Sequence, residues 1–375
     1  MLFTGLPPGL SDDNHEWVLD FCNFREAWSK TRGAGVVIAL PDTGWTHHPE
    51  LQAPNYRTEP ALSKNFYEPI KYASLASGHP DPNSQWSAED HLRDLSAGHG
   101  TGTASTIISP TGHPDGSSPG PTAAFPQNNV RAFVSGAAPE AAVIPLRVTD
   151  FVALDDDSCT ALSRCIFFCI SLRKAMNLDV GVMSLSLGRP RLGVEKNILA
   201  ALRAARHNGI IVIAAAGQLP GLSWPQDVGN PQFPGSDPNT ICVAACDSRH
   251  APLAGAFYGD EVLITAPGVN VWRAHSRREV SSDATFHVNR SEGTSYATAL
   301  TAAACALWQS HHGRAMLIER YGRSRLLTAF KMCLLTSADS DAVLDEGRGI
   351  GVLDADRLLE TSLPSRQLVE QADTR

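Results

Sequence analysis

Asp42, His99 and Ser295 are the residues of this 375-residue chain whose types and surroundings could together carry out nucleophilic catalysis. A hydroxyl attacks a carbonyl carbon when an imidazole accepts its proton, and a carboxylate bound to the imidazole fixes its tautomer. The three residues are far apart in the sequence. This chemistry therefore requires a fold that brings three distant segments together.

Asp42 ends an apolar run that begins at Val36, and Thr43 and Gly44 follow it. A buried strand holds its last residue rigidly, and the backbone N–H groups of a Thr-Gly turn keep a carboxylate ionised. The alternative is an aspartate that only starts a turn. In the catalytic interpretation, the strand end presents a fixed carboxylate.

His99 lies between Gly98 and Gly100, and these small residues let another backbone segment approach the imidazole. General-base catalysis requires such an approach, although a lone histidine is usually structural. Ser295 follows Thr294 at the start of a helical stretch of small residues, where backbone N–H groups and the helix dipole favour a developing negative charge. The alternative there is an ordinary helix N-cap.

The elements around these residues predict an α/β fold, with a three-layer arrangement in which a mostly parallel central sheet carries helices on both faces. Short β-branched runs alternate with longer helical stretches. A helix over 158–177 follows from apolar residues at helical spacing, and one over 194–208 ends in His-Asn-Gly. The expected strands cover residues 36–40, 143–147, 180–185, 210–214, 240–244 and 262–265.

The pattern favours one catalytic domain over residues 1–362. Two segments break its rhythm and are predicted to be surface insertions: about 53–97, which is polar, and about 109–126, which is rich in Gly, Pro and Ser. Residues 363–375 are predicted to form a polar C-terminal tail, and its last part, 367–375, is predicted to fray.

The composition argues against a nucleic-acid or membrane protein. The chain has 31 Lys and Arg against 39 Asp and Glu, a net charge of −8 without a basic stripe. The apolar run at 210–216 is far shorter than the roughly 20 residues of a membrane span. The first residues lack a basic and then apolar segment, so no secretory signal is predicted.

Eight cysteines lie mostly in apolar segments, which favours buried free thiols over disulfides. Their two C-x3-C spacings lack a second ligand pair, so no metal is assigned to them. Free thiols favour the cytoplasm; the sequence leaves the location otherwise unknown.

The order Asp42, His99, Ser295 resembles that of the subtilisin-like serine peptidases, the subtilase family. Further motifs cover most of the chain and stand in the family's order. The resemblance implies a subtilisin-like fold and a serine endopeptidase that works through an acyl-enzyme, with these three residues as its catalytic triad. The matching segments are 136–139 and 143–148 (GxAP and the next strand), 182–188 (SxSxG), 233–240, 265–268 and 347–355 (GxGxVxA).

The resemblance also implies a polypeptide substrate bound as an extended strand. Residues 185–188 would pair with the peptide on the acyl side of the cleaved bond, and the pocket for the residue before that bond would lie between them and 214–217. The small apolar residues there predict tolerance for a sizeable apolar side chain. The expected substrate-binding residues are Leu185, Ser186, Leu187, Gly188, Ala215, Ala216 and Gly217.

Three positions depart from the family pattern. Gln218 replaces the asparagine that supplies an oxyanion donor; glutamine keeps the amide donor but is one methylene longer, so we expect Gln218 to donate together with the Ser295 N–H. Gly102 replaces a second histidine, a change that concerns packing. Arg189 replaces a small residue and is either a loop charge or a contact to acidic substrate.

The resemblance implies no required cofactor. Residues 127–129 are similar to a calcium-binding loop, but the family's carboxylates cannot be matched, so a structural calcium stays an alternative. A catalytically weak or inactive peptide-binding module, or a dedicated processor of one precursor peptide, are the other functions considered. The oligomeric state stays open. A histidine has an ordinary pKa of about 6.5, so activity should rise from roughly pH 6 to 8.

Overall fold

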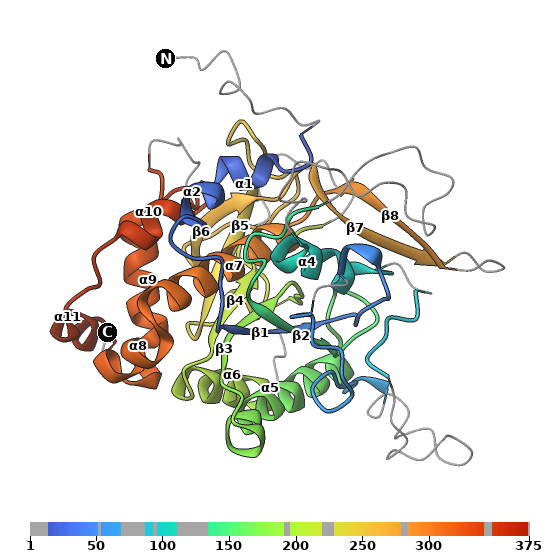
Figure 1. The fold of residues 1–375 in the computed structure, drawn as a ribbon, viewed down its shortest axis with the longest axis horizontal. Coiled ribbons are helices and arrows are strands. Elements are labelled where there is room, and N and C mark those ends of the chain that lie inside the picture. Colours follow the sequence, from blue (N-terminus) through green and yellow to red (C-terminus); the bar gives the residue numbers. More distant parts are fainter. Residues whose placement is uncertain are drawn as a thin grey trace.

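The computed structural model describes residues 14–51, 54–68, 87–92, 96–110, 134–190, 196–219, 229–278, 284–340 and 347–373. Its centre is a parallel sheet of six strands in the order β2-β1-β3-β4-β5-β6 (Figure 1). The strands are β1 (Val37–Asp42), β2 (Ala142–Arg147), β3 (Val180–Leu185), β4 (Ile211–Ala215), β5 (Thr240–Cys246) and β6 (Val262–Pro267).

Helices cover both faces of this sheet. α5 (Asp156–Met176) and α6 (Lys196–His207) pack on one face, and α4 (His99–Ile108) and α7 (Thr294–His312) pack on the other (Figure 1). This arrangement confirms the predicted α/β class, and all six expected strands are present with small shifts in their ends.

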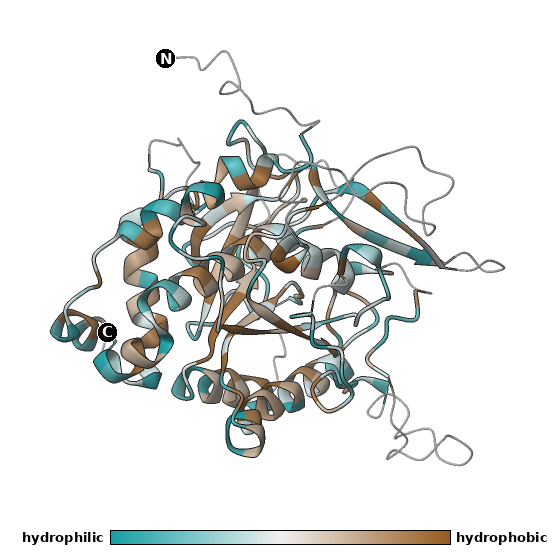
Figure 2. Cartoon of the chain, in the orientation of Figure 1, coloured by the Kyte–Doolittle hydropathy of each residue, from teal (hydrophilic) through white to brown (hydrophobic). Residues whose placement is uncertain are grey.

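Alternating side chains of each strand supply the two cores. In β1, Ile38 and Leu40 belong to the core under α7, whereas Val37 and Ala39 belong to the core under α5 and α6. A parallel strand covered on both faces is apolar at every position, which explains the unbroken apolar runs in the sequence. Figure 2 shows hydrophobic residues along the strands and hydrophilic ones on the outer faces of the helices.

Local signals set the ends of α5. The Asp155 carboxylate accepts a hydrogen bond from the Ser158 N–H, and Asn177 ends the helix in the left-handed conformation with φ 52°. An N-cap acceptor and a left-handed C-cap satisfy backbone groups that the helix itself leaves unpaired.

The described chain also contains elements that the sequence did not suggest. A two-stranded antiparallel hairpin, β7 (Val271–Arg278) with β8 (Ala284–Ser291), stands beside the main sheet (Figure 1). The remaining helical elements are α1 (Trp17–Phe21), α2 (Phe24–Ala27), η1 (Pro49–Leu51), α8 (Arg314–Tyr321), η2 (Arg323–Arg325), α9 (Leu326–Ser337), α10 (Ala355–Glu360) and α11 (Arg366–Asp373).

The C-terminal segment is folded where a frayed tail was expected. Within residues 363–375, helix α11 buries Val369 completely, and Asp373 accepts hydrogen bonds from Arg206 and Thr328. One apolar side chain per two turns was enough to dock this polar helix.

The described part of the first expected insertion is also packed rather than superficial. Tyr56 and Asn65 form bridges to strand β2, and Leu62 and Tyr67 are buried. These residues therefore extend the β2 edge of the sheet. Of the second expected insertion, 109–126, only residues 109–110 belong to the described residues.

All eight cysteines are buried and free, as expected. Among the described residues, no helix combines the length and the apolar character that crossing a membrane requires.

Candidate active site

Asp42 is the last residue of β1 and is 1% exposed. Strand β1 lies between β2 and β3, at the point where the strand order reverses, and such a point opens a crevice at the carboxyl ends of the strands. Its Oδ1 accepts hydrogen bonds from the Thr43 N–H at 2.7 Å and from His99, and Oδ2 accepts one from the Thr103 hydroxyl at 3.2 Å. These donors hold the carboxylate in one orientation.

A buried polar network holds the turn after Asp42. The Thr43 hydroxyl donates to the Asp90 carboxylate at 2.6 Å, and the Gly98 N–H donates to the same oxygen at 3.0 Å. Arg147 donates to the Thr43 carbonyl and forms an ion pair with Glu68 at 2.7 Å. Burial raises the pKa of the Asp90 carboxyl, and the hydrogen bonds it accepts oppose that shift.

His99 is the first residue of α4. Other backbone segments lie close to the glycines on either side of it, as the small size of these residues predicted. A Cβ on Gly98, whose φ is 70°, would lie 2.5 Å from the Ser276 carbonyl oxygen. A Cβ on Gly100 would lie 2.3 Å from the Gly44 carbonyl oxygen. Glycine is required at both positions because backbone occupies the place of a side chain.

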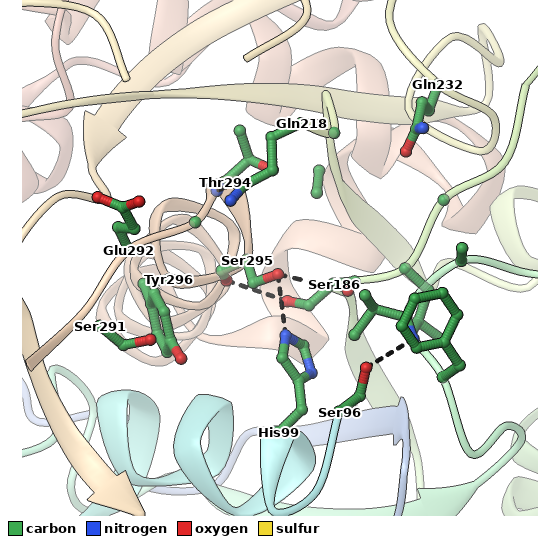
Figure 3. A pocket seen from close by; sticks show the side chains of 18 of the residues that line it. Ser96, His99, Ser186, Gln218, Gln232, Ser291, Glu292, Thr294, Ser295 and Tyr296 are labelled. Atoms are coloured by element: carbon green, nitrogen blue, oxygen red, sulfur yellow. Dashed lines mark hydrogen bonds between the residues drawn. The ribbon is translucent and has the colours of Figure 1, made fainter. Parts of the chain in front are cut away.

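The structure brings Asp42, His99 and Ser295 into one hydrogen-bonded line. His99 Nδ1 lies 2.7 Å from Asp42 Oδ1, and His99 Nε2 lies 3.0 Å from Ser295 Oγ (Figure 3). The hydrogen bond to the carboxylate assigns the proton to Nδ1, which leaves Nε2 as an acceptor for the serine hydroxyl. The His99 side chain is 15% exposed, so the line can be reached from outside.

Ser295 is the second residue of α7, whose N-terminus is capped from another loop. Gly293 provides no side-chain cap; instead the Gln218 side-chain oxygen accepts the Thr294 N–H at 2.8 Å (Figure 3). The Gln218 amide NH2 is left for another acceptor. The Ser295 N–H also has no acceptor among the described residues. The two donors that the sequence suggested thus stand at one helix terminus.

A cleft of about 590 Å³ opens beside Ser295. Its residues come from both the sheet and the hairpin, and it includes Ser186, Leu187, Gly188, Ala215 and Gly217 of the expected substrate-binding set. Leu185 and Ala216 are fully buried and lie behind it.

One wall of the cleft, which we call the strand wall, consists of residues 186–188, whose outer edge was expected to be free. Instead, the Gly188 N–H donates to the Val152 carbonyl at 3.1 Å, and the Leu154 N–H donates to the Gly188 carbonyl at 2.9 Å. The Ser96 hydroxyl in turn accepts the Val152 N–H at 3.2 Å (Figure 3). Residues 151–154, here called the strap, therefore pair with the edge at Gly188.

Gln232 occupies the space between the two segments of the expected side-chain pocket. A Cβ on Gly188 or on Gly217 would each lie 2.4 Å from the Gln232 side-chain oxygen. The amide has no hydrogen-bond partner among the described residues. This polar group differs from the expected apolar lining.

The opposite wall, here called the hairpin wall, belongs to β7 and carries charge. It contains Arg273 and His275. Burial, with the nearby Arg273 guanidinium, lowers the pKa of His275 to about 3. Burial likewise lowers the pKa of His48 to about 4; its Nδ1 accepts the Glu50 N–H at 3.1 Å, so the ring is neutral and its Nε2 donates to the His287 carbonyl at 3.0 Å.

Two further expectations concern charges and metals. Arg189 binds Asp156 of α5 at 2.7 Å, so it is a paired charge at the edge of the site rather than a free cation. Among the described residues, no cluster of three or more His, Cys, Asp or Glu side chains could hold a metal ion. The segment 127–129, considered for calcium, lies outside the described residues.

Sequence reasoning missed Gln232, Arg273 and the strap. Gln232 immediately precedes residues 233–240, one of the segments that match the subtilase pattern. That position next to a matching segment is the signal that could have identified Gln232. Arg273 lies in a hairpin that was not predicted. The strap acts through backbone groups, which leave no residue-type signal.

Known proteins resemble this chain over most of its length. The model of the Subtilase family matches residues 33–351. Subtilisin Savinase of Lederbergia lenta is 28% identical over 275 residues, which cover 73% of this chain and 76% of that protein. An alkaline protease of Alkalihalobacillus alcalophilus is also 28% identical over 275 residues. The match covers 73% of this chain and 54% of that protein.

Solved structures share the fold. MycP1 with its N-terminal propeptide removed has a TM-score of 0.63 at 21% identity, with 94% of this chain and 100% of that chain covered. The prenylagaramide maturation protease PagA has a TM-score of 0.56 at 21% identity, with 90% and 97% covered.

Proposed function

This chain belongs to the subtilase family, and from that premise we propose that it is a serine endopeptidase with Asp42, His99 and Ser295 as its catalytic triad. The observation that carries the proposal is the continuous hydrogen-bonded line from Asp42 Oδ1 through His99 to Ser295 Oγ, at 2.7 and 3.0 Å. Nucleophile and base within this distance, with the base oriented by a third group, form the arrangement that activates a hydroxyl.

In the proposed reaction, Ser295 Oγ attacks the carbonyl carbon of the cleaved bond while His99 Nε2 takes the hydroxyl proton. The resulting imidazolium is stabilised by Asp42, which stays ionised. His99 then gives the proton to the leaving amine nitrogen, the C–N bond breaks, and an acyl-enzyme remains. Water, deprotonated by the same imidazole, releases the acid and restores Ser295.

The negative charge on the attacked carbonyl oxygen needs donors. We assign the Ser295 N–H and the Gln218 amide NH2 to this role. The Gln218 side-chain oxygen is held by the Thr294 N–H at 2.8 Å, which fixes the amide plane next to the nucleophile. The extra methylene of glutamine is accommodated because the side chain anchors on the helix terminus itself.

The substrate would be a polypeptide that crosses Ser295 in an extended form. On the acyl side, pairing with Gly188 requires that the strap leave, because its Val152 and Leu154 use the same backbone groups. The pocket next to Gln232 favours a small side chain or one that can hydrogen-bond an amide.

Labelling with a fluorophosphonate probe tests the proposal. We expect the purified chain to be labelled at pH 8 on Ser295, and Ser295→Ala to remain unlabelled. Failure of the wild-type chain to react would overturn the peptidase proposal and favour a peptide-binding module instead.

Cleavage of a peptide library then tests whether the reactive serine hydrolyses peptides and which ones. Activity should rise from roughly pH 6 to 8, the range in which a histidine general base is expected to act. A flat profile over this range would contradict a histidine base.

A further inference from the structure

Arg273 is a buried cation that faces the cleft without a carboxylate partner. Its side chain lines the cleft, and the residue is 9% exposed. Within the described residues its only hydrogen bond goes from Nη1 to the Ala274 carbonyl at 3.0 Å, and its Nε has no acceptor. The other buried arginine among the described residues, Arg147, forms an ion pair with the Glu68 carboxylate.

Burying a charge without a partner is unfavourable unless something else supplies the opposite charge. The groups around Arg273 do not. His48, His275 and His287 lie near it. Burial and the guanidinium charge lower the pKa of each imidazole, so the three rings are neutral and supply no negative charge. Glu292 lines the same cleft but is exposed and makes no ion pair with Arg273 in the described structure.

The helix that carries His99 leaves room for this side chain. A Cβ on Gly102, one turn after His99, would lie 2.9 Å from Arg273 Cδ and 3.4 Å from its Nε. The departure from the family pattern at Gly102 therefore has a structural counterpart: the arginine takes the space beside α4. The hydrogen bond to Ala274 then fixes the plane of the guanidinium.

The position of Arg273 indicates which part of a substrate it would meet. The expected acyl-side strand, at Ser186 and Gly188, forms one wall, and the hairpin with Arg273 forms the other, with Ser295 between them. In Figure 3, Ser186 and Gln232 lie on one side of Ser295, whereas Ser291, Glu292 and Tyr296 lie on the other. The leaving amine takes its proton from His99 of α4, and α4 packs against β7, so we expect the leaving chain to pass along the hairpin wall.

We propose that Arg273 binds a carboxylate on the leaving-group side of the substrate, within the first few residues after the cleaved bond. This inference rests on the proposed peptidase function. The planar guanidinium matches a carboxylate in a two-pronged geometry. The carboxylate is an Asp or Glu side chain or the C-terminus of the substrate, and the experiment separates these two sources.

The test compares peptides that share one sequence before the cleaved bond. After it, Asp replaces Asn at one of the first three positions in turn, with the C-terminus amidated; one further peptide has Asn throughout and a free C-terminal acid. We expect kcat/KM to favour the acidic peptide over its neutral partner by about 10- to 100-fold, the range of a charge-assisted hydrogen bond.

Substitutions assign the preference to Arg273. Arg273→Gln should bring the ratio of acidic to neutral kcat/KM close to one, and Arg273→Lys should give an intermediate ratio because lysine keeps the charge but lacks the planar fork. Arg277→Gln is the matched control: it removes an equal charge from an exposed position on the same strand, and its ratio should equal that of the wild type.

Binding gives a readout that does not need catalysis. The same peptides, labelled with a fluorophore, are titrated into Ser295→Ala, and Kd should show the same preference for the acid. Preference for the Asp peptides supports a side-chain carboxylate, and preference for the free acid supports the C-terminus.

Equal binding of acidic and neutral peptides, or an unchanged ratio in Arg273→Gln, would overturn the Arg273 proposal alone. No cleavage and no fluorophosphonate labelling, with an acid preference retained in binding, would overturn the peptidase proposal but support the carboxylate site.

Discussion

The two walls of the cleft differ in how completely their polar groups are paired. On the strand wall, Gly188 already exchanges two backbone hydrogen bonds with the strap, at 2.9 and 3.1 Å. On the hairpin wall, Arg273 is buried and has no anion within the described structure. The strand wall has to break its hydrogen bonds with the strap before a peptide can pair with it. The hairpin wall can bind a carboxylate without breaking an existing ion pair.

This difference indicates where recognition acts. Displacing the strap exchanges one set of backbone hydrogen bonds for an equivalent set, so acyl-side pairing adds little net free energy. An anion beside Arg273 replaces an unpaired buried charge, and such an exchange is favourable. We therefore expect residues after the cleaved bond to dominate selectivity. Four measurements test this contrast and the centre between the walls.

The largest effect on kcat is expected at the proposed triad, which lies between the two walls. Asp42→Asn should lower kcat by about 10,000-fold, because asparagine favours the wrong imidazole tautomer. The loss should be equal for peptides that extend toward either wall. Kinetics with both peptide types measures it, and circular dichroism checks the fold. A loss confined to one peptide type would mean that the walls are coupled through the triad.

Loss of Gln218, the proposed oxyanion donor, should give the second largest effect. Loss of one such donor costs about 100- to 1,000-fold in kcat in serine peptidases, so we expect a loss in this range for Gln218→Ala. Gln218→Asn keeps the amide but shortens its reach to the Thr294 N–H and should lie in between. Unchanged turnover in the alanine variant would exclude Gln218 from this role.

Loosening the strap should make it easier for a peptide to pair with the strand wall, and the expected change in kcat/KM is smaller than the two effects above. Ser96→Ala removes the acceptor of the Val152 N–H, and the loss of one hydrogen bond, about 1 kcal/mol, corresponds to roughly a fivefold easier opening. We expect kcat/KM to rise by about that factor for peptides with four residues before the cleaved bond, and not for peptides with two.

Ser171→Ala on the exposed face of α5 is the control for Ser96→Ala. If Ser96→Ala accelerates long and short acyl-side peptides alike, the strap does not compete with substrate.

The last prediction concerns the support of the hairpin wall and is a change in stability rather than in activity. The pKa of His48 is about 4 in the folded chain and about 6.5 when unfolded. The unfolded chain thus binds more protons between these values, so the free energy of unfolding should fall as pH drops from 6.5 toward 4, by up to about 3 kcal/mol.

Urea unfolding at pH 7 and at pH 4.5 measures this loss. His48→Gln should show a smaller difference between the two pH values, because it removes one proton-binding site. His207→Gln, at an exposed position on α6, should behave like the wild type. An equal difference in all three chains would show that His48 does not link the hairpin to pH.

The sequence was sufficient for the elements whose apolar residues form continuous runs or recur at helical spacing. The six strands of the main sheet are mostly apolar and buried along almost their whole length because both faces are covered, and the glycines around His99 marked close backbone approach. The elements that bring Asp42, His99 and Ser295 together could therefore be predicted from the chain alone.

The rest could not be predicted, for physical reasons. In β7 the buried residues include the polar Arg273 and Ser276, so the alternation of apolar residues that indicates a strand is missing. Helix α11 docks through Val369 and a pair between Arg206 and Asp373, and neither is a local signal. The strap depends on which backbone groups meet, which no residue type specifies.

The strap has one more consequence, for the chain in the absence of any peptide. An unpaired strand edge is a template on which another chain can add, and such edges promote self-association. Because Val152 and Leu154 cover Gly188, the resting molecule does not offer this template to its own copies. The strap, which we expect to compete with the substrate, would therefore also reduce self-association of the protein at high concentration.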